Sequence, residues 1–574
     1  AGWLAVCPPA TARASRRTHK HFPPPFRSPL SWPLLLGSLP FAGAPSIQSY
    51  YDITMPPPIA FLLPLFFLIA ATVPSSRAAD ADAGPAVPQP RGFYINCGAD
   101  KEVQVGSIKW VPDAGFIAVG NASAVDKPAI LPVLATLRHF PDATARKYCY
   151  TVPAVKGSRY LVRTTYFYGG FDGGTEPPVF DQIVDGTLWS AVNTADSARR
   201  GMSTYFEMVA QAQGKSMSVC LARRPDTKSS PFISALELVD LEDSMYNTTD
   251  FDKYVLSTVT RSAMGAKGEI ISYPDDQYNR YWAPFTDGNP TTESHSPIAP
   301  ADFWNLPPAK ALKGAITTSR GKKLTVQWPP LELPFASYYV ALYFQDPRTA
   351  SPYSWRVFDV SMNGKDFFLG LNATAAGVMV YSNTIQLAGK TEILLTPNGT
   401  CPVGPLINAA EIYQIVPVGG RTATRDVDAM EDLARSLKNP PPDWAGDPCL
   451  PPQNSWTGVG CSDDSPVRVL SLDLKNRGLS GCLPDSIGNL TGMNTISLSG
   501  NKLSGPIPDF SSMQTLTALH LDGNQFSGAI NPSLANLTNL KELFLNDNNL
   551  SGLIPPSLKT KPGLVMRTEG NKLQ

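Results

Sequence analysis

A short pattern recurs at a nearly constant interval in the last third of the chain, and it limits the possible folds more than any other feature. The segments TISLSGNKLSGPIP, ALHLDGNQFSGAIN and ELFLNDNNLSGLIP place Asn501, Asn524 and Asn548 at intervals of 23 and 24 residues. In each copy the alternating apolar residues predict a short strand, and the asparagine is placed to bond the backbone of the turn. Copies this short cannot each bury a core, so they must stack, and the sequence predicts a parallel ladder of strands.

This period and pattern are those of leucine-rich repeats. An earlier copy, VLSLDLKNRGLSGCLP, has Arg477 in place of the asparagine, and a partial copy ends at Gln574. An outermost repeat often departs from the pattern in this way. We therefore expect four to five repeats over residues 467–574, the last one incomplete, in a short α/β solenoid.

A solenoid needs its terminal core covered, and residues 424–466 have the features of such a cap. The segment VDAMEDLARSL predicts a helix that ends at Asn439, before three prolines. Cys449 and Cys461 are spaced for a small disulfide loop, and two tryptophans lie near them. One apolar face of the helix is expected to point inward, made of Val427, Met430, Ala434 and Leu437.

Residues 91–418 contain a second, looser repeat. Both copies consist of short stretches rich in Val, Ile, Tyr and Phe, separated by Gly, Pro, Asn and Asp, which is typical of antiparallel β-structure. Two β-sandwiches, at residues 91–245 and 262–418, are the simplest architecture. The matched positions are Phe180-Asp181 with Phe358-Asp359, Gly186 with Gly364, Pro231–Leu241 with Pro405–Ile415, and Glu237 with Glu411.

Residues 55–79 have the layout of a secretory signal peptide, with an apolar stretch followed by small residues and a cleavage position near Ala79. An uncleaved membrane anchor is the alternative, although the stretch is short for a span and contains Pro64. Residues 1–54 do not begin with Met, and we interpret them as upstream or misassigned sequence, although their composition also imitates a transit peptide.

Two further features agree with secretion. Without Cys7, which lies upstream of the presumed start, seven cysteines remain, so one thiol is free or pairs with another chain. Cys482, on a repeat turn, is our candidate for that thiol, while Cys97 and Cys401 have no certain partner either. Sequons for N-linked glycosylation occur in both halves of the chain, at Asn121, Asn247, Asn372, Asn398, Asn489, Asn536 and Asn549.

The composition excludes some classes of function. The 48 lysines and arginines balance the 48 aspartates and glutamates, so nothing electrostatic indicates a nucleic-acid partner. The sequence has no Cys-x-x-Cys motif and no Cys/His cluster with metal-ligand spacing, and its five histidines are scattered. We therefore predict neither a metal site nor a cofactor.

The residues also resemble a known family. YINCGAD, LRHFPDATARKYCYTVP, YLVRTTYFYGGFDGG, SVCLARR, PFISALELVDL and SYPDDQYNRYWAPF look like the tandem malectin-like ectodomain of plant leucine-rich-repeat receptor-like proteins and kinases. The GDPC and W-x-G-V-x-C elements of the cap, followed by the repeats, complete that pattern. The resemblance implies a mainly β fold, with two tandem jelly-roll sandwiches followed by the repeats, in an extracellular protein at the cell surface.

The sequence departs from the kinase members of this family, which continue through a membrane span into a cytoplasmic kinase. It contains no Gly-rich nucleotide loop, no HRD, no DFG and no apolar stretch after residue 80 that is long enough to span. Because Gln574 falls inside a repeat, we expect that a membrane anchor and a short tail are missing from this sequence.

A ligand site is expected on a loop of the first sandwich. Animal malectin, which these modules are similar to, holds a disaccharide with exposed aromatic residues and an aspartate. In YFYGGFDGG the corresponding candidates are Tyr168, Phe171 and Asp172, with Phe140 and Tyr150 nearby. The alternative is that the aromatic residues of this stretch are core positions of a strand. The matching loop of the second sandwich has Asp346, Arg348 and Tyr353 instead, which argues against a sugar site there.

The inner face of the repeat ladder is expected to contact a protein partner. Its candidates are His520, Asp522, Phe544 and Asn546, and solvated surface is the alternative. Four to five repeats suit docking of a co-receptor better than enclosure of a long peptide. The other variable positions on this face are Asp473, Ser497 and Ser499.

These observations favour a receptor-like protein without enzymatic activity, which binds a cell-wall glycan or a secreted peptide and signals through a receptor kinase or co-receptor. A secreted, soluble carbohydrate-binding or decoy protein is one alternative. A glycoside hydrolase using Asp275 and Asp276, or Asp172, is another, but adjacent residues on an extended strand point to opposite faces. We therefore interpret SYPDDQYNRYW as a structural segment at the junction of the two sandwiches.

Overall fold

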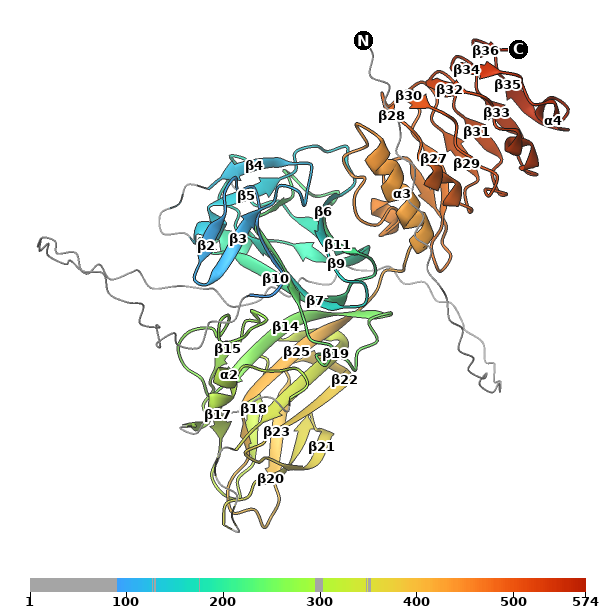
Figure 1. Cartoon of the computed structure of the whole chain (residues 1–574). Coiled ribbons are helices and arrows are strands. Elements are labelled where there is room, and N and C mark those ends of the chain that lie inside the picture. Colours follow the sequence, from blue (N-terminus) through green and yellow to red (C-terminus); the bar gives the residue numbers. More distant parts are fainter. Residues whose placement is uncertain are drawn as a thin grey trace, which may run out of the picture. The chain divides into compact units, whose positions relative to one another are not determined.

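The computed structural model describes residues 90–125, 127, 131–174, 176–294, 303–346, 348, 351 and 353–574. The predicted signal peptide and the residues before it lie outside these ranges. The described chain forms two compact units, which are coloured by sequence in Figure 1. One contains residues up to 431 together with 440–472, and the other contains 432–439 and 473–574.

One large sheet runs through both sandwich modules, which confirms the mainly β fold and adds a connection that the sequence did not predict. Among the described residues this sheet has eleven strands, and β15 (Ala283–Phe285) pairs with β14 beside the main order. That order is β2 (Val103–Val105), β3 (Ile108–Pro112), β1 (Phe93–Asn96), β13 (Ala235–Asp240), β7 (Arg159–Tyr166), β10 (Thr204–Gln211), β14 (Tyr254–Met264), β25 (Ala409–Pro417), β19 (Leu333–Phe344) and β22 (Val378–Gly389).

The first module comprises β1 to β13 and the second β14 to β25, and they join where β10 pairs with β14 in antiparallel register. A four-stranded sheet completes each sandwich. In the first module it is β6 (Tyr148–Pro153), β11 (Ser216–Arg223), β8 (Phe180–Val184) and β9 (Thr187–Val192). In the second it is β18 (Leu324–Gln327), β23 (Glu392–Pro397), β20 (Val357–Met362) and β21 (Lys365–Asn372).

Smaller elements close the ends of the sandwiches. They are the sheet of β12 (Phe232–Ile233), β5 (Thr136–His139) and β4 (Asn121–Ala124), and the sheet of β16 (Thr291–Glu293), β17 (Gly314–Thr317) and β24 (Leu406–Ile407). Short helices are η1 (Pro132–Leu134), α1 (Ala195–Arg199) and α2 (Ala309–Lys313).

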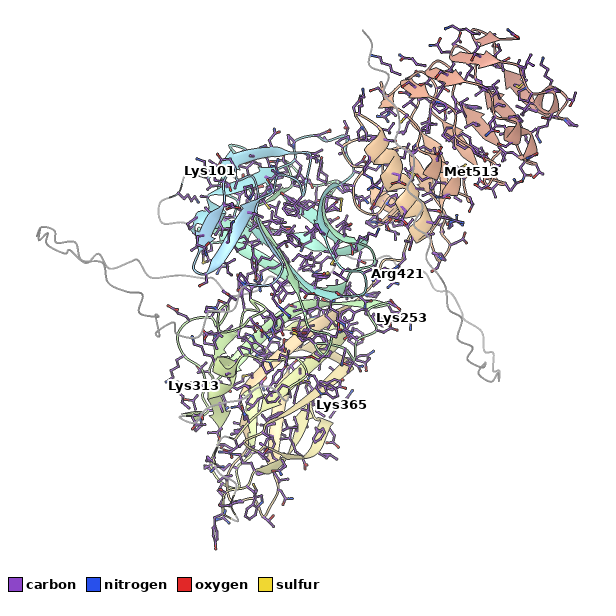
Figure 2. The ribbon with its side chains drawn as sticks, in the orientation of Figure 1. Lys101, Lys253, Lys313, Lys365, Arg421 and Met513 are labelled. Atoms are coloured by element: carbon purple, nitrogen blue, oxygen red, sulfur yellow. A yellow bond between two sulfur atoms is a disulfide. The ribbon has the colours of Figure 1, made fainter. Side chains whose placement is uncertain are left out.

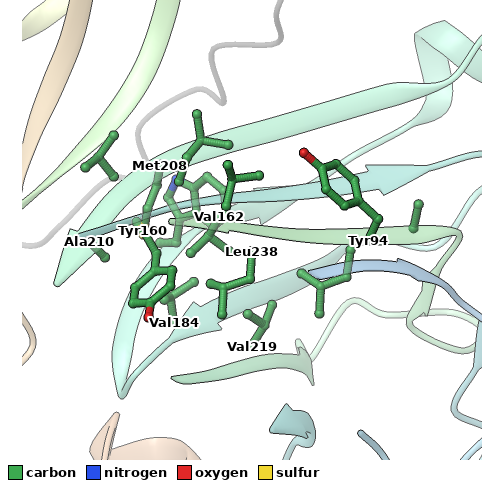
Figure 3. Packing of buried hydrophobic residues seen from close by; sticks show 14 of the residues in the cluster. Tyr94, Tyr160, Val162, Val184, Met208, Ala210, Val219 and Leu238 are labelled. Atoms are coloured by element: carbon green, nitrogen blue, oxygen red, sulfur yellow. The ribbon is translucent and has the colours of Figure 1, made fainter. Parts of the chain in front are cut away.

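The sandwich cores follow from strand alternation, which sends every second side chain inward. Val162, Met208 and Leu238 from three neighbouring strands pack with Val219 of the facing sheet, and all four are buried (Figure 3). Charged side chains such as Lys365 project from the ribbon into solvent (Figure 2). The alternating pattern of the sequence therefore predicted the type of core correctly.

The internal repeat is visible in the structure. The turn between β8 and β9 has Asp185 and Gly186 at φ 44° and 76°, and the turn between β20 and β21 has Asn363 and Gly364 at φ 48° and 74°. Two consecutive positive φ angles define the hairpin turn that matches the twist of its strands, and they favour Asn or Asp followed by Gly. The matched sequence positions thus occupy the same structural place.

The second unit is the predicted solenoid. Its parallel ladder consists of β29 (Thr495–Ser497), β31 (Ala518–His520), β33 (Glu542–Phe544) and β35 (Val565–Arg567). A second ladder contains β28 (Ser480–Gly481), β30 (Lys502–Gly505), β32 (Gln525–Gly528), β34 (Asn549–Gly552) and β36 (Lys572–Leu573). Helical turns η3 (Asp485–Asn489), η4 (Pro532–Asn536) and α4 (Pro556–Lys559) connect them.

The cap contains α3 (Thr424–Ser436), η2 (Pro452–Asn454), β26 (Val459–Cys461) and β27 (Val469–Asp473). The predicted disulfide between Cys449 and Cys461 is confirmed. The buried face of α3 differs in part from the prediction, because Ala429 and Leu433 are buried while Val427 and Ala434 are only half-buried. A helix with few apolar residues leaves this choice of face to tertiary contacts.

Two more cysteine assignments come from the structure. Cys149 and Cys220, on the paired strands β6 and β11, form a disulfide. The prediction that Cys482 is the odd thiol is wrong, because Cys482 is disulfide-bonded. Cys97 and Cys401 are the free, buried thiols among the described residues.

The cap residues 440–472 belong to the same unit as the first module and bond directly to it. Arg146 Nη1 donates to Ser455 Oγ at 2.9 Å, and Lys147 Nζ donates to the main-chain oxygen of Leu450 at 2.9 Å. Gly446 lies so close to the Cys149–Cys220 disulfide that an added Cβ would be 3.1 Å from both sulfur atoms. We call this contact region the cap joint.

Candidate functional site

The acidic segment SYPDDQYNRYW lies against the large sheet and has no feature of an active site. Asp276 is buried, and its Oδ2 accepts hydrogen bonds from Arg280 Nε at 2.9 Å and from Trp282 Nε1 at 2.8 Å. Asp275 pairs with Lys310 at the surface, with 2.7 Å between Oδ2 and Nζ. The two carboxylates therefore serve different partners and do not face each other across a cleft, as glycoside cleavage requires.

A row of buried charges crosses the module boundary on the face of the sheet opposite the two sandwich cores. Arg163 Nη1 donates to Glu237 Oε2 at 2.8 Å, and its Nη2 donates to Glu207 Oε2 at 2.6 Å. Arg261 Nε donates to Glu411 Oε2 at 2.9 Å, and its Nη2 contacts Glu207. The residues alternate in sign over five neighbouring strands, and we call them the charge ladder: Glu237, Arg163, Glu207, Arg261 and Glu411.

Burial and the neighbouring charges shift the pKa values of the carboxylates in the charge ladder. Burial raises the pKa of Glu207, but the guanidinium groups of Arg261 and Arg163 outweigh burial and lower that pKa to about 2. Burial raises the pKa of Glu237, with only one arginine in opposition. Each arginine of the charge ladder thus bonds two carboxylates, and Glu207 bonds an arginine of each module.

The structure removes two residues from the predicted ligand site. Phe140 and Tyr150 are both 0 % exposed. Phe140 stacks on Tyr148 with ring centroids 4.6 Å apart, and the Tyr150 hydroxyl donates to Asp113 Oδ2 at 2.9 Å. Both side chains are parts of the core and have no surface for a ligand, so the prediction that they contact one is wrong.

Phe171 and Asp172 lie at the surface of the same module. Asp172 is exposed, and its Oδ1 accepts from the hydroxyl of the buried Tyr168 at 2.6 Å. Phe171 is half-buried, and its ring centroid is 4.9 Å from that of His139. The hydrogen bonds of Tyr168 and Ser229 outweigh the effect of burial and lower the pKa of Asp172, so this carboxylate is an acceptor at neutral pH.

His139 was not predicted as part of this surface. Its Nδ1 is buried and has no hydrogen-bond partner among the described residues. Burial lowers the pKa of His139 below its usual value, which favours the neutral ring. Only the position of LRHF directly before a loop pointed to it in the sequence, and this signal is weak.

The corresponding loop of the second module differs in chemistry. Asp346 is buried, and its Oδ2 accepts from Arg348 Nη2 and from Arg356 Nε, both at 2.6 Å. This carboxylate is thus occupied by two arginines. Tyr353 of the same loop is strongly exposed, and the expectation that this loop holds no sugar site stays a prediction.

Two of the four predicted partner-contact residues belong to a stacked row on the repeat ladder. His520 and Phe544 are neighbours in register, with ring centroids 4.3 Å apart and planes 7° from parallel. Arg567 continues the row, with its guanidinium carbon 4.5 Å from the Phe544 centroid. Asp522 accepts from Ser499 Oγ at 2.6 Å, and Asn546 donates to Asp547. We call His520, Phe544 and Arg567 the stacked row.

Arg567 was missed in the sequence because it lies in the incomplete last copy. Its place in that copy is the same as that of His520 and Phe544 in theirs, so the repeat period was a sufficient signal. His520 Nε2 also lies 2.8 Å from Glu542 Oε2, and no nucleophile accompanies this pair.

All seven sequon asparagines are exposed, so each is accessible for glycosylation. Within the described ranges no group of three His, Cys, Asp or Glu side chains is placed to hold a metal ion. None of the described helices has the length and apolar character that crossing a membrane requires.

Comparison with known proteins identifies the two sandwich modules. The model of the malectin-like domain matches residues 95–415, which is more than half of the chain. The chain belongs to the malectin-like domain family. The model of the leucine-rich repeat matches residues 515–537 and 539–560, inside the solenoid. Both parts of the resemblance in the sequence are therefore confirmed.

Two curated relatives come from Arabidopsis thaliana. The probable LRR receptor-like serine/threonine-protein kinase PAM74 is 30% identical over 402 residues, which are 67% of this chain and 44% of that protein. A probable leucine-rich repeat receptor-like protein kinase is 30% identical over 398 residues, covering 67% of this chain and 43% of that protein. This malectin-like chain thus spans less than half the length of these relatives.

Solved structures similar to the malectin-like region include the ANX2 ectodomain from Arabidopsis thaliana, with a TM-score of 0.48 and 18% identity. That match covers 57% of this chain and 97% of the other. A complex of the plant peptide RALF23 with FER and LLG2 has a TM-score of 0.47 and 17% identity, covering 58% of this chain and 96% of the other.

Proposed function

We propose that this malectin-like chain is the extracellular, ligand-binding part of a receptor-like protein at the cell surface. The observation that supports this most is the malectin-like match over residues 95–415 followed by leucine-rich repeats, in a chain whose relatives are named receptor-like kinases. Exposed sequons and disulfides agree with the secretory pathway. A secreted, soluble decoy is the alternative, and a membrane-fractionation experiment on the native protein separates the two.

The proposed ligand is a cell-wall carbohydrate or a secreted peptide, and the proposed contact is the loop of Phe171 and Asp172. An aromatic ring beside a carboxylate is the arrangement that holds a sugar, because the ring covers C–H groups while the carboxylate accepts paired hydroxyl bonds. Asp172 is exposed and Phe171 is half-buried, so both are accessible.

The proposed partner is a receptor kinase or co-receptor that contacts the stacked row on the repeat ladder. Phe544 lies between an imidazole and a guanidinium, and aromatic and arginine side chains are the types most enriched at interface hot spots. We propose no catalytic role for the chain, because Asp275 and Asp276 are engaged by Lys310 and Arg280.

The test is binding of the purified secreted chain to an array of wall oligosaccharides and to candidate receptor-kinase ectodomains. We expect Phe171→Ala and Asp172→Asn to weaken ligand binding by about tenfold or more, the loss typical of a central interface contact. We expect Phe544→Ala to weaken partner binding by a similar factor and to leave ligand binding unchanged.

Matched controls are available in the same parts of the chain. Val155→Ala removes an apolar side chain that is 66% exposed in the first module, and Leu553→Ala removes one that is 70% exposed in the repeats. Neither is expected to change binding. Failure of the chain to bind any wall oligosaccharide, peptide or receptor ectodomain would contradict the proposal. Turnover of a wall polysaccharide that is lost in Asp172→Asn would favour a hydrolase instead.

A further inference from the structure

Strand β22 is the outermost strand of the large sheet at the side of the second module (Figure 1). It is twelve residues long, and its sequence VMVYSNTIQLAG has no charged residue and no proline. Among the described residues no strand pairs with its outer edge. Natural proteins usually protect such an edge with lysine, proline or a very short strand, because its free N–H and C=O groups can pair with another chain.

The internal repeat identifies the strand of the first module that is equivalent to β22. Glu237 on β13 is opposite Arg163 on β7, and Arg163 is opposite Glu207 on β10. In the second module Glu411 on β25 is opposite Ala341 on β19, and Ala341 is opposite Tyr381 on β22. Since Glu237 and Glu411 are matched positions, β22 is the counterpart of β10.

The outer edge of β10 is occupied. Strand β14 pairs with it in antiparallel register, with Met208 opposite Ser257 and Val209 opposite Leu256. The fold therefore already adds a strand at this position once, inside the chain, and leaves the equivalent position of the second module open.

The two edges differ in charge, and this difference indicates the chemistry of an added strand. On β10, Glu207 pairs with Arg261 of β14, the strand that occupies that edge. The equivalent residue of β22 is Tyr381. Tyr381 stacks on Tyr339 with centroids 6.2 Å apart and lies 6.0 Å from Trp304, which is 52% exposed. A segment that pairs with β22 would thus contact the aromatic ring of Tyr381, whereas β14 contacts the carboxylate of Glu207.

The other face of the same edge is also apolar. Val378 and Ile385 of β22 and Phe367 of β21 pack against the core of the second module but are only partly buried. Side chains of an added strand alternate between the two faces, so both sets would meet uncharged groups. Strand β22 itself has no charged residue to pair with an acidic or basic segment.

We propose that the outer edge of β22 is a docking site for an extended, uncharged segment of a secreted peptide, which pairs with it in antiparallel orientation. This rests on the proposed receptor function and deepens it, by naming a site and a ligand class. Main-chain hydrogen bonds supply the affinity in this mode, and pockets for alternate side chains supply the specificity.

Two predicted glycosylation positions favour a peptide over a second copy of the chain. Asn383 of β22 donates to the main-chain oxygen of Thr248, the neighbour of the sequon residue Asn247, and Asn372 lies at the end of β21 just before β22. Both sequon asparagines are exposed. A glycan at either position would crowd a second folded module more than a single extended strand, which is narrower.

The test uses the full chain and a displayed library of random twelve-residue peptides. Peptides that bind are expected to be rich in uncharged β-branched and aromatic residues. On binding, they are expected to slow amide hydrogen exchange in residues 378–389 more than elsewhere. N-methylation of alternate peptide residues on the pairing side should weaken binding by about tenfold or more, while methylation on the opposite side should have little effect, because only one side donates to β22.

Thr384→Lys and Thr292→Lys form a matched pair of variants. Both threonines are exposed on edge strands, β22 and β16, so each change adds one charge to an edge without touching a core. Thr384→Lys should weaken peptide binding by about tenfold, as charges on edges do, and Thr292→Lys should not.

Three results would overturn the proposal. They are a library without binders, binders that protect the Phe171 loop or the stacked row instead of β22, and a concentration-dependent dimer that Thr384→Lys abolishes. A chain that binds wall oligosaccharides but no library peptide at β22 would leave the receptor function standing while the peptide edge fails. Absence of both kinds of binding would remove the receptor function as well.

Discussion

The guanidinium of Arg261 on β14 lies directly against the carboxylate of Glu207 on β10, and this ion pair connects the second malectin-like module to the first. Both residues are at most 3% exposed. The strand pairing at this place is short, so the ion pair and its neighbours in the charge ladder contribute much of the connection. The modules are consequently expected to unfold together.

Replacing Glu207 by Gln is expected to lower the free energy of unfolding by about 3–5 kcal/mol at neutral pH, because the change leaves Arg163 and Arg261 buried with one carboxylate fewer. Chemical denaturation followed by tryptophan fluorescence measures the difference. The exposed Asp366→Asn is the control, with an expected change below about 0.5 kcal/mol.

The same variant has an expected pH dependence. The pKa of Glu207 is lowered from 4.5 to about 2 in the folded chain. Its stabilising effect is therefore complete above pH 4.5 and is lost as the pH falls from 4.5 toward 2. The difference between the wild-type chain and Glu207→Gln should shrink over that window, and a difference that stays constant down to pH 2 would argue against the ion pair.

The solenoid and the repeat of the two modules were predictable because each is a pattern of residue types along the chain. The period of Asn501, Asn524 and Asn548 fixed the ladder, and the match of Glu237 with Glu411 fixed the equivalence of β13 and β25. The charge ladder was not predictable. Arg163 is a single charge in an apolar strand, and the sequence does not show whether such a residue faces water or a buried partner on another strand.

The candidate sites were predictable only in part for a related reason. Phe140 and Tyr150 were wrongly expected at a surface. Aromatic residues near a loop give the same sequence pattern whether they lie in the core or at a ligand site. Burial depends on which strands pack above them, and that information is tertiary. His520 and Phe544, by contrast, follow from the repeat period, which places each side chain on a known face.

Substitution of a buried repeat asparagine such as Asn524 is expected to destabilise the repeats strongly. Its Nδ2 donates to the main-chain oxygens of Leu498 at 2.9 Å and Leu521 at 3.1 Å, and its Oδ1 accepts from Leu503 N at 3.0 Å. Asn524→Ala leaves these buried groups unpaired and should lower the free energy of unfolding of the repeats by about 1–3 kcal/mol.

Thermal unfolding monitored by circular dichroism measures this loss. The control is Asn539→Ala, because Asn539 makes a single side-chain hydrogen bond at the surface, to Gln514, and its loss should stay within about 0.5 kcal/mol. Equal losses in the two variants would show that the asparagine ladder does not hold the turns.

Two groups of opposite charge lie at the cap joint and do not pair with each other. Lys147 is buried, and Asp185 is half-buried with a buried Oδ2, next to Gly186, which packs against Leu450. Burial lowers the pKa of Lys147 to about 8, and the nearby Asp447 and Asp443 offset only part of this effect. Burial raises the pKa of Asp185 to about 7, although its Oδ1 accepts from the main-chain N and the hydroxyl of Ser218. The Oδ2 of Asp185 has no hydrogen-bond partner among the described residues.

The signs of these shifts predict a minimum in the stability of the cap joint between pH 7 and pH 8. The pKa of Asp185 is raised from 3.8 to about 7, so stability is lost as the pH rises over that range. The pKa of Lys147 is lowered from 10.5 to about 8, so stability is lost as the pH falls from 10.5 toward 8. Between the two windows both groups are charged at once.

Amide hydrogen exchange in residues 443–456, corrected for the intrinsic effect of pH, measures the stability of the cap joint. Asp185→Asn is expected to remove the acidic limb of the profile and to slow exchange at pH 7.5, because it replaces a carboxylate by a neutral group of the same shape. Lys147→Met should remove the alkaline limb only. Strands β7 and β10 are the internal reference and should exchange alike in all three proteins. A profile that rises or falls steadily through pH 7 to 8, or one that neither variant changes, would show that these two groups do not control the joint.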